Sequence, residues 1–208
     1  MEKIELKPAS VFHYFAEICK VPRPSKKEEK IIAYLMNFAA EQGLEAKKDE
    51  AGNILIKKAA TPGKENLKTV ILQSHIDMVC EKNSDSNHDF LNDPIETYID
   101  GEWLKAKGTT LGADNGIGMA TQLAILAAND IQHGPLECLF TVDEETGLTG
   151  AFALKEGFMD GHILINLDSE DEGELFIGCA GGANTTAEFA YTEIDAPQDY
   201  FFFKVAIK

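Results

Sequence analysis

Residues 69–77 read Thr-Val-Ile-Leu-Gln-Ser-His-Ile-Asp. The run Thr69–Leu72 is almost continuously apolar, which is typical of a strand buried on both faces of a parallel sheet. Two side chains with useful chemistry, His75 and Asp77, follow this run directly. The stretch therefore predicts a central strand that leads into a functional site, because ligands of α/β sheets bind where parallel strands end.

On both sides of this stretch, strand and helix patterns alternate. Apolar residues recur with helical period at 10–19, after a possible Ser10 N-cap, and from the capping-box pattern at 25–28 to Gly43. A glycine-rich turn at 112–116 opens another helix, and a short helix is expected around 151–154. Further strands are expected at 54–56, 136–142 and 163–167, with a hairpin at Asp100-Gly101. The alternation predicts an α/β fold, with a mostly parallel sheet flanked by helices.

Composition excludes several classes of protein. The 208 residues carry 19 Lys+Arg against 35 Asp+Glu, a formal net charge of −16. This sign disfavours a protein that binds nucleic acid or a polybasic membrane-surface protein. The chain has no apolar run long enough to cross a bilayer and no secretory signal at its start, and its four cysteines are widely separated. We therefore expect a cytoplasmic protein with reduced thiols, no membrane partner and no nucleic-acid partner.

Polar side chains occur at corresponding positions along the chain, at strand ends or at the start of a helix. They are His75, Asp77, Asp114, Glu144, Glu145 and Asp168. The carboxyl ends of parallel strands share one edge of a sheet, so these side chains should converge. One imidazole with several carboxylates is the ligand chemistry of zinc and similar divalent metals.

The spacing of these residues suggests which of them could bind metal and which could orient a ligand or act as a base. Residues two apart on an extended segment point to the same side, so Asp77 could accept the ring N–H of His75 that faces away from a metal. Adjacent Glu144 and Glu145 point in different directions. One of them can bind metal while the other stays free as a general base.

Rival motifs fail on inspection. Residues 168–173 imitate the start of a calcium loop, but its twelfth position is Cys179 instead of a glutamate. The glycines at 116 and 118 lack the third glycine of a dinucleotide-binding fingerprint, and no phosphate-binding P-loop pattern occurs.

Four motifs, taken together and in order, resemble the M20 family of dinuclear metallopeptidases. They are Ser74-His75-Ile76-Asp77-Met78-Val79-Cys80-Glu81-Lys82, Leu111-Gly112-Ala113-Asp114-Asn115-Gly116, Asp143-Glu144-Glu145-Thr146-Gly147 and Leu167-Asp168-Ser169-Glu170. Within the family they look most like the branch of aminoacyl-histidine dipeptidases. The resemblance covers nearly the whole chain and implies a catalytic domain of the dizinc-peptidase type.

The resemblance also implies a role for each residue. His75 and Asp168 would bind one metal, Asp114 would bridge two metals, and Glu145 would bind the second. Glu144 would be the general base, and Asp77 would orient His75. The expected cofactors are two divalent ions, zinc or else manganese or cobalt. The expected reaction is hydrolysis of small dipeptides of the X-His type by a metal-bridged hydroxide.

Several expectations concern the end of the chain. The family's second metal takes a histidine from a late segment, whereas none of the five histidines (His13, His75, His88, His133 and His162) follows Asp168. We expect residues 1–190 to be the N-terminal part of the catalytic domain. Residues 191–208 would begin a lid domain through which the full-length enzyme forms a homodimer, and strands are expected at 185–190 and 200–207.

The sequence is compatible with several alternatives. The chain could be a non-catalytic fragment or binding module of the same fold, or an M20 enzyme that acts on N-acyl amino acids or tripeptides. His88 lies in a loop that could reach the site, whereas His133 and His162 are interpreted as surface or loop residues.

Overall fold

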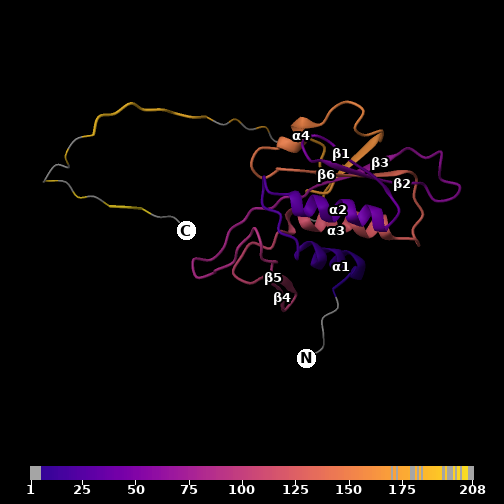
Figure 1. The fold of residues 1–208 in the computed structure, drawn as a ribbon, viewed down its shortest axis with the longest axis horizontal. Coiled ribbons are helices and arrows are strands. Elements are labelled where there is room, and N and C mark those ends of the chain that lie inside the picture. Colours follow the sequence, from indigo (N-terminus) through magenta and orange to yellow (C-terminus); the bar gives the residue numbers. More distant parts are fainter. Residues whose placement is uncertain are drawn as a thin grey trace. The chain divides into compact units, whose positions relative to one another are not determined.

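The computed structural model describes residues 6–169 without a gap, and beyond them residues 171, 173–178, 181, 183, 185–193, 195, 199, 201 and 203–205 (Figure 1). The chain divides into two units, Met1–Glu172 and Gly173–Lys208. All the helices and strands that the structure describes lie in the first unit.

The centre of the first unit is a five-stranded sheet in the order β1-β2-β6-β3-β7. Its strands are β1 (Glu45–Lys48), β2 (Ile54–Lys58), β3 (Val70–His75), β6 (Leu136–Thr141) and β7 (Ile163–Asn166). Strands β6, β3 and β7 run parallel, and β1 and β2 add an antiparallel edge. The α/β class is confirmed, with a mixed sheet whose parallel strands are those that lead to the predicted site.

Three helices cover one face of this sheet (Figure 1). They are α1 (Ala9–Ile18), α2 (Glu29–Glu41) and α3 (Ala113–Ala127). Because side chains alternate along a strand, Leu72 and Phe140 enter the core beneath these helices, whereas Ile71 and Leu139 enter a smaller core on the opposite face. The smaller core is closed by residues 154–159, which follow the short helix α4 (Thr149–Ala153). Burial of apolar side chains on both faces therefore stabilises β3 and β6.

The predicted hairpin is present as β4 (Thr97–Asp100) and β5 (Trp103–Ala106), which pair antiparallel. The predicted end of the second helix is also confirmed, since α2 ends at Glu41 and Gly43 has the left-handed φ of 66° that such a stop favours. No described helix is both long and apolar enough to cross a membrane.

Predictions at two helix starts were wrong. Ser10 lies inside α1, whose N-cap is Pro8. The capping box at 25–28 does not form, because the Ser25 hydroxyl donates to the Asp77 carboxylate at 2.7 Å and α2 starts only after Glu28. Ser25 was predicted to cap the helix, but its hydroxyl instead donates a hydrogen bond to a residue from a distant part of the sequence.

The second unit differs from prediction as well. The structure describes residues 185–190 without a strand, which corrects the expectation made from their apolar pattern. Strands are stable only when neighbours accept and donate their backbone hydrogen bonds, and a pattern alone supplies no neighbour. The strand expected at 200–207 lies largely outside the described residues.

Candidate metal centre

The structure brings the six predicted side chains together at the carboxyl edge of the parallel strands. His75 ends β3, and Asp77 follows two residues later. Asp114 lies in the first turn of α3, where the backbone is not yet helical. Glu144 and Glu145 follow β6, and Asp168 follows β7. Topology accounts for five of the six, because three parallel strands deliver their following residues to one edge, and the start of α3 adds Asp114.

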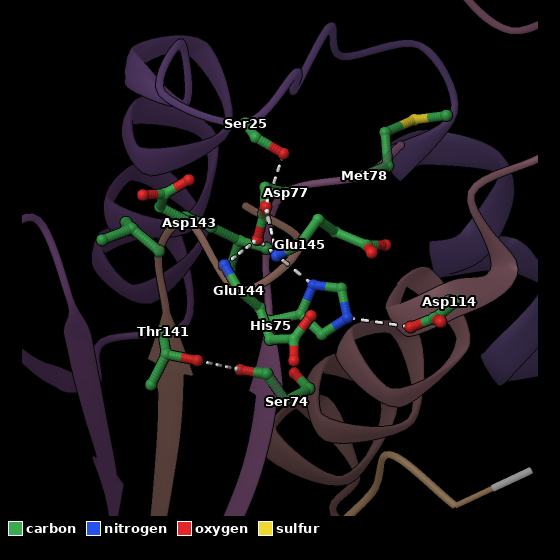
Figure 2. Close-up of polar contacts among 12 residues, drawn as sticks. Ser25, Ser74, His75, Asp77, Met78, Asp114, Thr141, Asp143, Glu144 and Glu145 are labelled. Carbon is green, nitrogen blue, oxygen red and sulfur yellow. Dashed lines mark hydrogen bonds and ion pairs between the residues drawn. The ribbon is translucent and has the colours of Figure 1, made fainter. Parts of the chain in front are cut away.

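The His75 ring lies between two carboxylates, as Figure 2 shows. Its Nδ1 is 3.2 Å from Asp77 Oδ1, and its Nε2 is 2.8 Å from Asp114 Oδ1. The Nε2 atom also lies 3.8 Å from Asp168 Oδ2. The ring is buried, with 1% of its surface exposed. If Asp77 accepts the Nδ1–H, then Nε2 is the nitrogen left to face a cation together with Asp114 and Asp168.

Asp77 also accepts hydrogen bonds from groups other than the imidazole. Its fully buried carboxylate accepts hydrogen bonds from the backbone N–H groups of Glu144 (3.0 Å) and Glu145 (3.2 Å), and from the Ser25 hydroxyl. Burial by itself raises the pKa of Asp77, but the hydrogen bonds lower it by more. The pKa is therefore about 2, below the usual 3.8. Asp77 is therefore an anion that fixes both the histidine and the loop of adjacent glutamates.

Among the described residues, two of the three sets of side chains that are close enough together to bind metal contain His75, and the third is Glu28, Asp77 and Asp143. Of the two sets with His75, one also contains Asp114 and Asp168, and the other contains Glu144 and Glu145. Within each set, one potential donor atom from every residue lies within 4.8 Å of the others. A nitrogen with several carboxylate oxygens fits a divalent metal such as zinc, manganese or cobalt. The residues present therefore fit the metal chemistry that the sequence predicted.

Charge in this cluster is unbalanced without a cation. Burial lowers the pKa of His75, but hydrogen bonds to Asp77 and Asp114 outweigh it and raise the pKa from 6.5 to about 9. Burial raises the pKa of Glu144, Glu145 and Asp168. The negative charge of Asp114 raises these three pKa values further, whereas the positive charge of His75 lowers them. The carboxylates thus favour a positive charge among them, and a bound cation would supply it.

Other residues that shape the site were not found from the sequence. The Glu28 carboxylate accepts the backbone N–H of Asp143 at 3.1 Å, and Asp143 adopts a left-handed φ of 48°. The hydroxyls of Thr146 and Thr149 donate to the Asp143 carboxylate, which stabilises this turn. No periodic pattern marks such contacts. The only signal in the sequence is a buried-strand pattern that ends on an acidic residue followed by threonines.

The remaining histidines that sequence reasoning considered lie elsewhere. His133 Nδ1 lies 2.8 Å from the Gly134 carbonyl, and the backbone N–H of His162 donates to Thr69. His88 packs edge-on against Phe90. Within the described part of the chain, His75 is the only histidine in a potential metal-binding group. His88 therefore stands outside the metal-binding groups of this structure.

The fold and the site together define a class: an α/β domain that gathers an imidazole and carboxylates for divalent metal at the ends of its parallel strands. The chain belongs to peptidase family M20/M25/M40, which it matches over residues 71–202. The family predicted from the four motifs is thereby confirmed.

Three relatives show how far the likeness extends. The chain is 50% identical to the cytosol non-specific dipeptidase of Escherichia coli over 207 residues, 100% of this chain and 43% of that protein. A solved aminoacylhistidine dipeptidase from Vibrio alginolyticus superposes with a TM-score of 0.79 and 58% identity, covering 81% of this chain and 34% of that one. The solved aminopeptidase PepT from Bacillus cereus superposes with a TM-score of 0.67 and 26% identity, covering 78% of this chain and 43% of that one. The chain thus spans less than half the length of each of these relatives.

Proposed function

We propose that this chain carries the greater part of the catalytic centre of a metal-dependent dipeptidase. The observation that carries the proposal is the His75 imidazole, whose Nε2 faces Asp114 and Asp168 while its Nδ1 faces a buried carboxylate. Two relatives that are at least half identical to the chain, the Escherichia coli and Vibrio alginolyticus proteins, are described as dipeptidases. Small dipeptides, X-His dipeptides among them, are the proposed substrates.

In this proposal His75 and Asp168 would hold one divalent ion, Glu145 would hold a second, and Asp114 would be a ligand of both. When bound, the ions supply Lewis acidity, which makes water a better nucleophile and stabilises negative charge on the peptide carbonyl oxygen. Zinc is the proposed metal, and manganese and cobalt suit the same donors. Further ligands for the second ion would come from outside the six residues described above.

Glu144 is the proposed general base. It takes the proton from the attacking water and passes it to the departing amine, so the proton that one step removes is used by the next. Burial raises the pKa of its carboxyl, which brings its proton affinity closer to that of a base working near neutral pH. The hydrogen bond from its backbone N–H to Asp77 fixes the position from which it acts.

The wider organisation is also proposed. Residues 1–190 would form the N-terminal part of the catalytic domain, and residues 191–208 would begin a lid domain that forms a homodimer. The share of the relatives' length that this chain covers supports a larger protein. The name of the Escherichia coli relative supports a cytoplasmic location.

The test uses the complete polypeptide that contains this chain. It is stripped of metal with a chelator, reloaded with zinc, manganese or cobalt, and assayed on X-His dipeptides, other dipeptides, a tripeptide and an N-acyl amino acid. We expect dipeptide hydrolysis that disappears on chelation and returns on reloading. Hydrolysis that survives complete metal removal would overturn the proposal, and a preference for tripeptides or N-acyl amino acids would overturn its substrate class.

A further inference from the structure

Arg23 is unusual in this sequence. Of 19 Lys and Arg residues it is the only arginine, and it is buried, with 3% of its surface exposed. Charged side chains are seldom buried without partners, because removing them from water is costly. A lone buried guanidinium beside the candidate metal centre therefore needs an explanation.

Arg23 makes hydrogen bonds to two separate backbone segments. Arg23 Nη1 donates to the carbonyl oxygens of Ile76 (3.1 Å) and Asp77 (2.7 Å), and Nη2 donates to the carbonyl oxygen of Gly112. The Arg23 carbonyl in turn accepts the backbone N–H of Met78 at 3.2 Å. One residue thus binds the segment just after His75 and the segment just before Asp114.

These contacts depend on the shape of arginine. A guanidinium is a rigid planar fork that can donate in several fixed directions at once, and it keeps its proton in proteins. A lysine ammonium is a single point of charge on a flexible stem. Only the fork can reach the carbonyls of residues 76, 77 and 112 together, which is consistent with an arginine here in a chain whose other basic residues are lysines.

Glycines leave room for this fork. A Cβ atom at Gly112 would lie 2.5 Å from Arg23 Nη2, and one at Gly116 would lie 2.8 Å from the same atom. Gly112 also has a φ of 70°, but Gly116 does not have a positive φ. At Gly116, therefore, the absence of a side chain serves close packing with Arg23 and Phe15 and is not required by the backbone.

We propose that Arg23 is a positioning residue that holds the His75 segment and the Asp114 segment at the separation that metal binding requires. The inference rests on the proposed function, since it assigns these two segments to one metal centre. Arg23 acts on the backbone of both segments, and the metal-binding side chains follow the backbone. This role differs from that of Asp77, which contacts the His75 ring itself.

The test compares four variants of the complete polypeptide. Arg23→Met removes the fork at similar length, and Arg23→Lys keeps the charge without the fork. Gly116→Ala disturbs the guanidinium from the other side. Lys27→Met is the matched control, because it removes an exposed positive charge from the same loop and its side chain makes no hydrogen bond or ion pair among the described residues.

Three measurements are made on each variant: the metal dissociation constant by chelator competition, hydrogen exchange of residues 76–78 and 112–116 in the metal-free protein, and kcat and KM. In Arg23→Met we expect a metal dissociation constant roughly 10–100-fold higher, as when other residues that orient metal ligands are lost. We also expect faster exchange in both segments, and a lower kcat with little change in KM. Arg23→Lys and Gly116→Ala should fall between wild type and Arg23→Met, and Lys27→Met should match wild type.

Several results would overturn the inference. Metal affinity and exchange in Arg23→Met that match wild type would do so, as would a lower melting temperature with unchanged metal affinity. Should Arg23→Met not fold, the same measurements on Arg23→Lys and Gly116→Ala decide the question. Should wild type bind no metal, the proposed function fails, whereas the exchange data still decide whether Arg23 holds the two segments.

Discussion

Asp77 Oδ1 accepts the backbone N–H of Glu144 at 3.0 Å, which fastens the segment that follows His75 to the loop that carries the candidate base. The same carboxylate faces His75 Nδ1 and accepts the N–H of Glu145. A single buried anion thus fixes a proposed metal ligand and the proposed base relative to each other. Its removal should disturb metal binding and catalysis together.

Asp77→Asn tests this coupling. The amide keeps one oxygen but turns the other acceptor into a donor, so the donors that converge on Asp77 cannot all be satisfied. We expect metal affinity to fall by roughly 10–100-fold and kcat to fall with it. Chelator competition and steady-state kinetics measure the two effects. Asp85→Asn, at an exposed position, is the control, and an Asp77→Asn enzyme with normal metal affinity would contradict the coupling.

The stability of the metal-free protein should depend on pH through His75 and Asp77. The pKa of His75 is raised from 6.5 to about 9, so its contribution is complete below pH 6.5 and is lost as pH rises through 9. The pKa of Asp77 is lowered from 3.8 to about 2, so its contribution is complete above pH 3.8 and is lost as pH falls through 2. The pair therefore stabilises the metal-free fold most between pH 3.8 and 6.5.

Melting temperatures of chelated wild type and His75→Asn measure this dependence. The difference between the two proteins should shrink between about pH 6 and about pH 10, because His75 loses its stabilising proton over that range. A difference that stays constant over this range would show that His75 is not protonated in the folded, metal-free protein.

Packing beneath the helices should dominate stability. Phe140 is fully buried between the sheet and the helices, whereas Phe152 on α4 is 82% exposed. We expect Phe140→Ala to lower the free energy of unfolding by about 3–5 kcal/mol, because it leaves a cavity in the core. Phe152→Ala should change it by less than about 0.5 kcal/mol. Denaturant unfolding of both variants checks the contrast, and equal losses would contradict the described core.

Thiol reactivity should follow burial. Burial raises the pKa of Cys19 to about 11, against the opposing charge of Arg23, and raises that of Cys138 to about 12. At about pH 8, roughly one such thiol in a thousand or fewer is ionised, and the ionised form is the one that reacts. We expect iodoacetamide to modify half-buried Cys80 before Cys19 and Cys138. Peptide mapping after brief treatment measures the order, and equally fast labelling of Cys138 in the folded protein would contradict it.

Strands with a distinct apolar pattern could be predicted from the sequence. The apolar run at 69–72 and the strand pattern at 136–142 predicted β3 and β6, because strands buried on both faces need continuous apolar sequence. The site followed from the same logic, since the polar residues after those strands had to meet at one edge. His75 and its neighbour Asp77 were found in this way.

Side-chain contacts between segments far apart in the chain could not be predicted from the sequence. Ser25 has the spacing of a helix cap, yet its hydroxyl donates to Asp77, more than fifty residues away. Arg23 has no local pattern at all, and its three acceptors are backbone carbonyls, which every residue possesses. Such contacts depend on the folded arrangement and leave no periodic trace in the sequence.

The most direct test of the proposed catalytic centre is Glu144→Ala in the complete polypeptide, with bound metal and dipeptide hydrolysis measured on the same sample. If Glu144 is the base and His75, Asp114, Glu145 and Asp168 hold the metals, two divalent ions per chain should remain bound while hydrolysis falls by a factor of about 10²–10⁴. Hydrolysis at the wild-type rate, or loss of the metals together with activity, would contradict this division of roles.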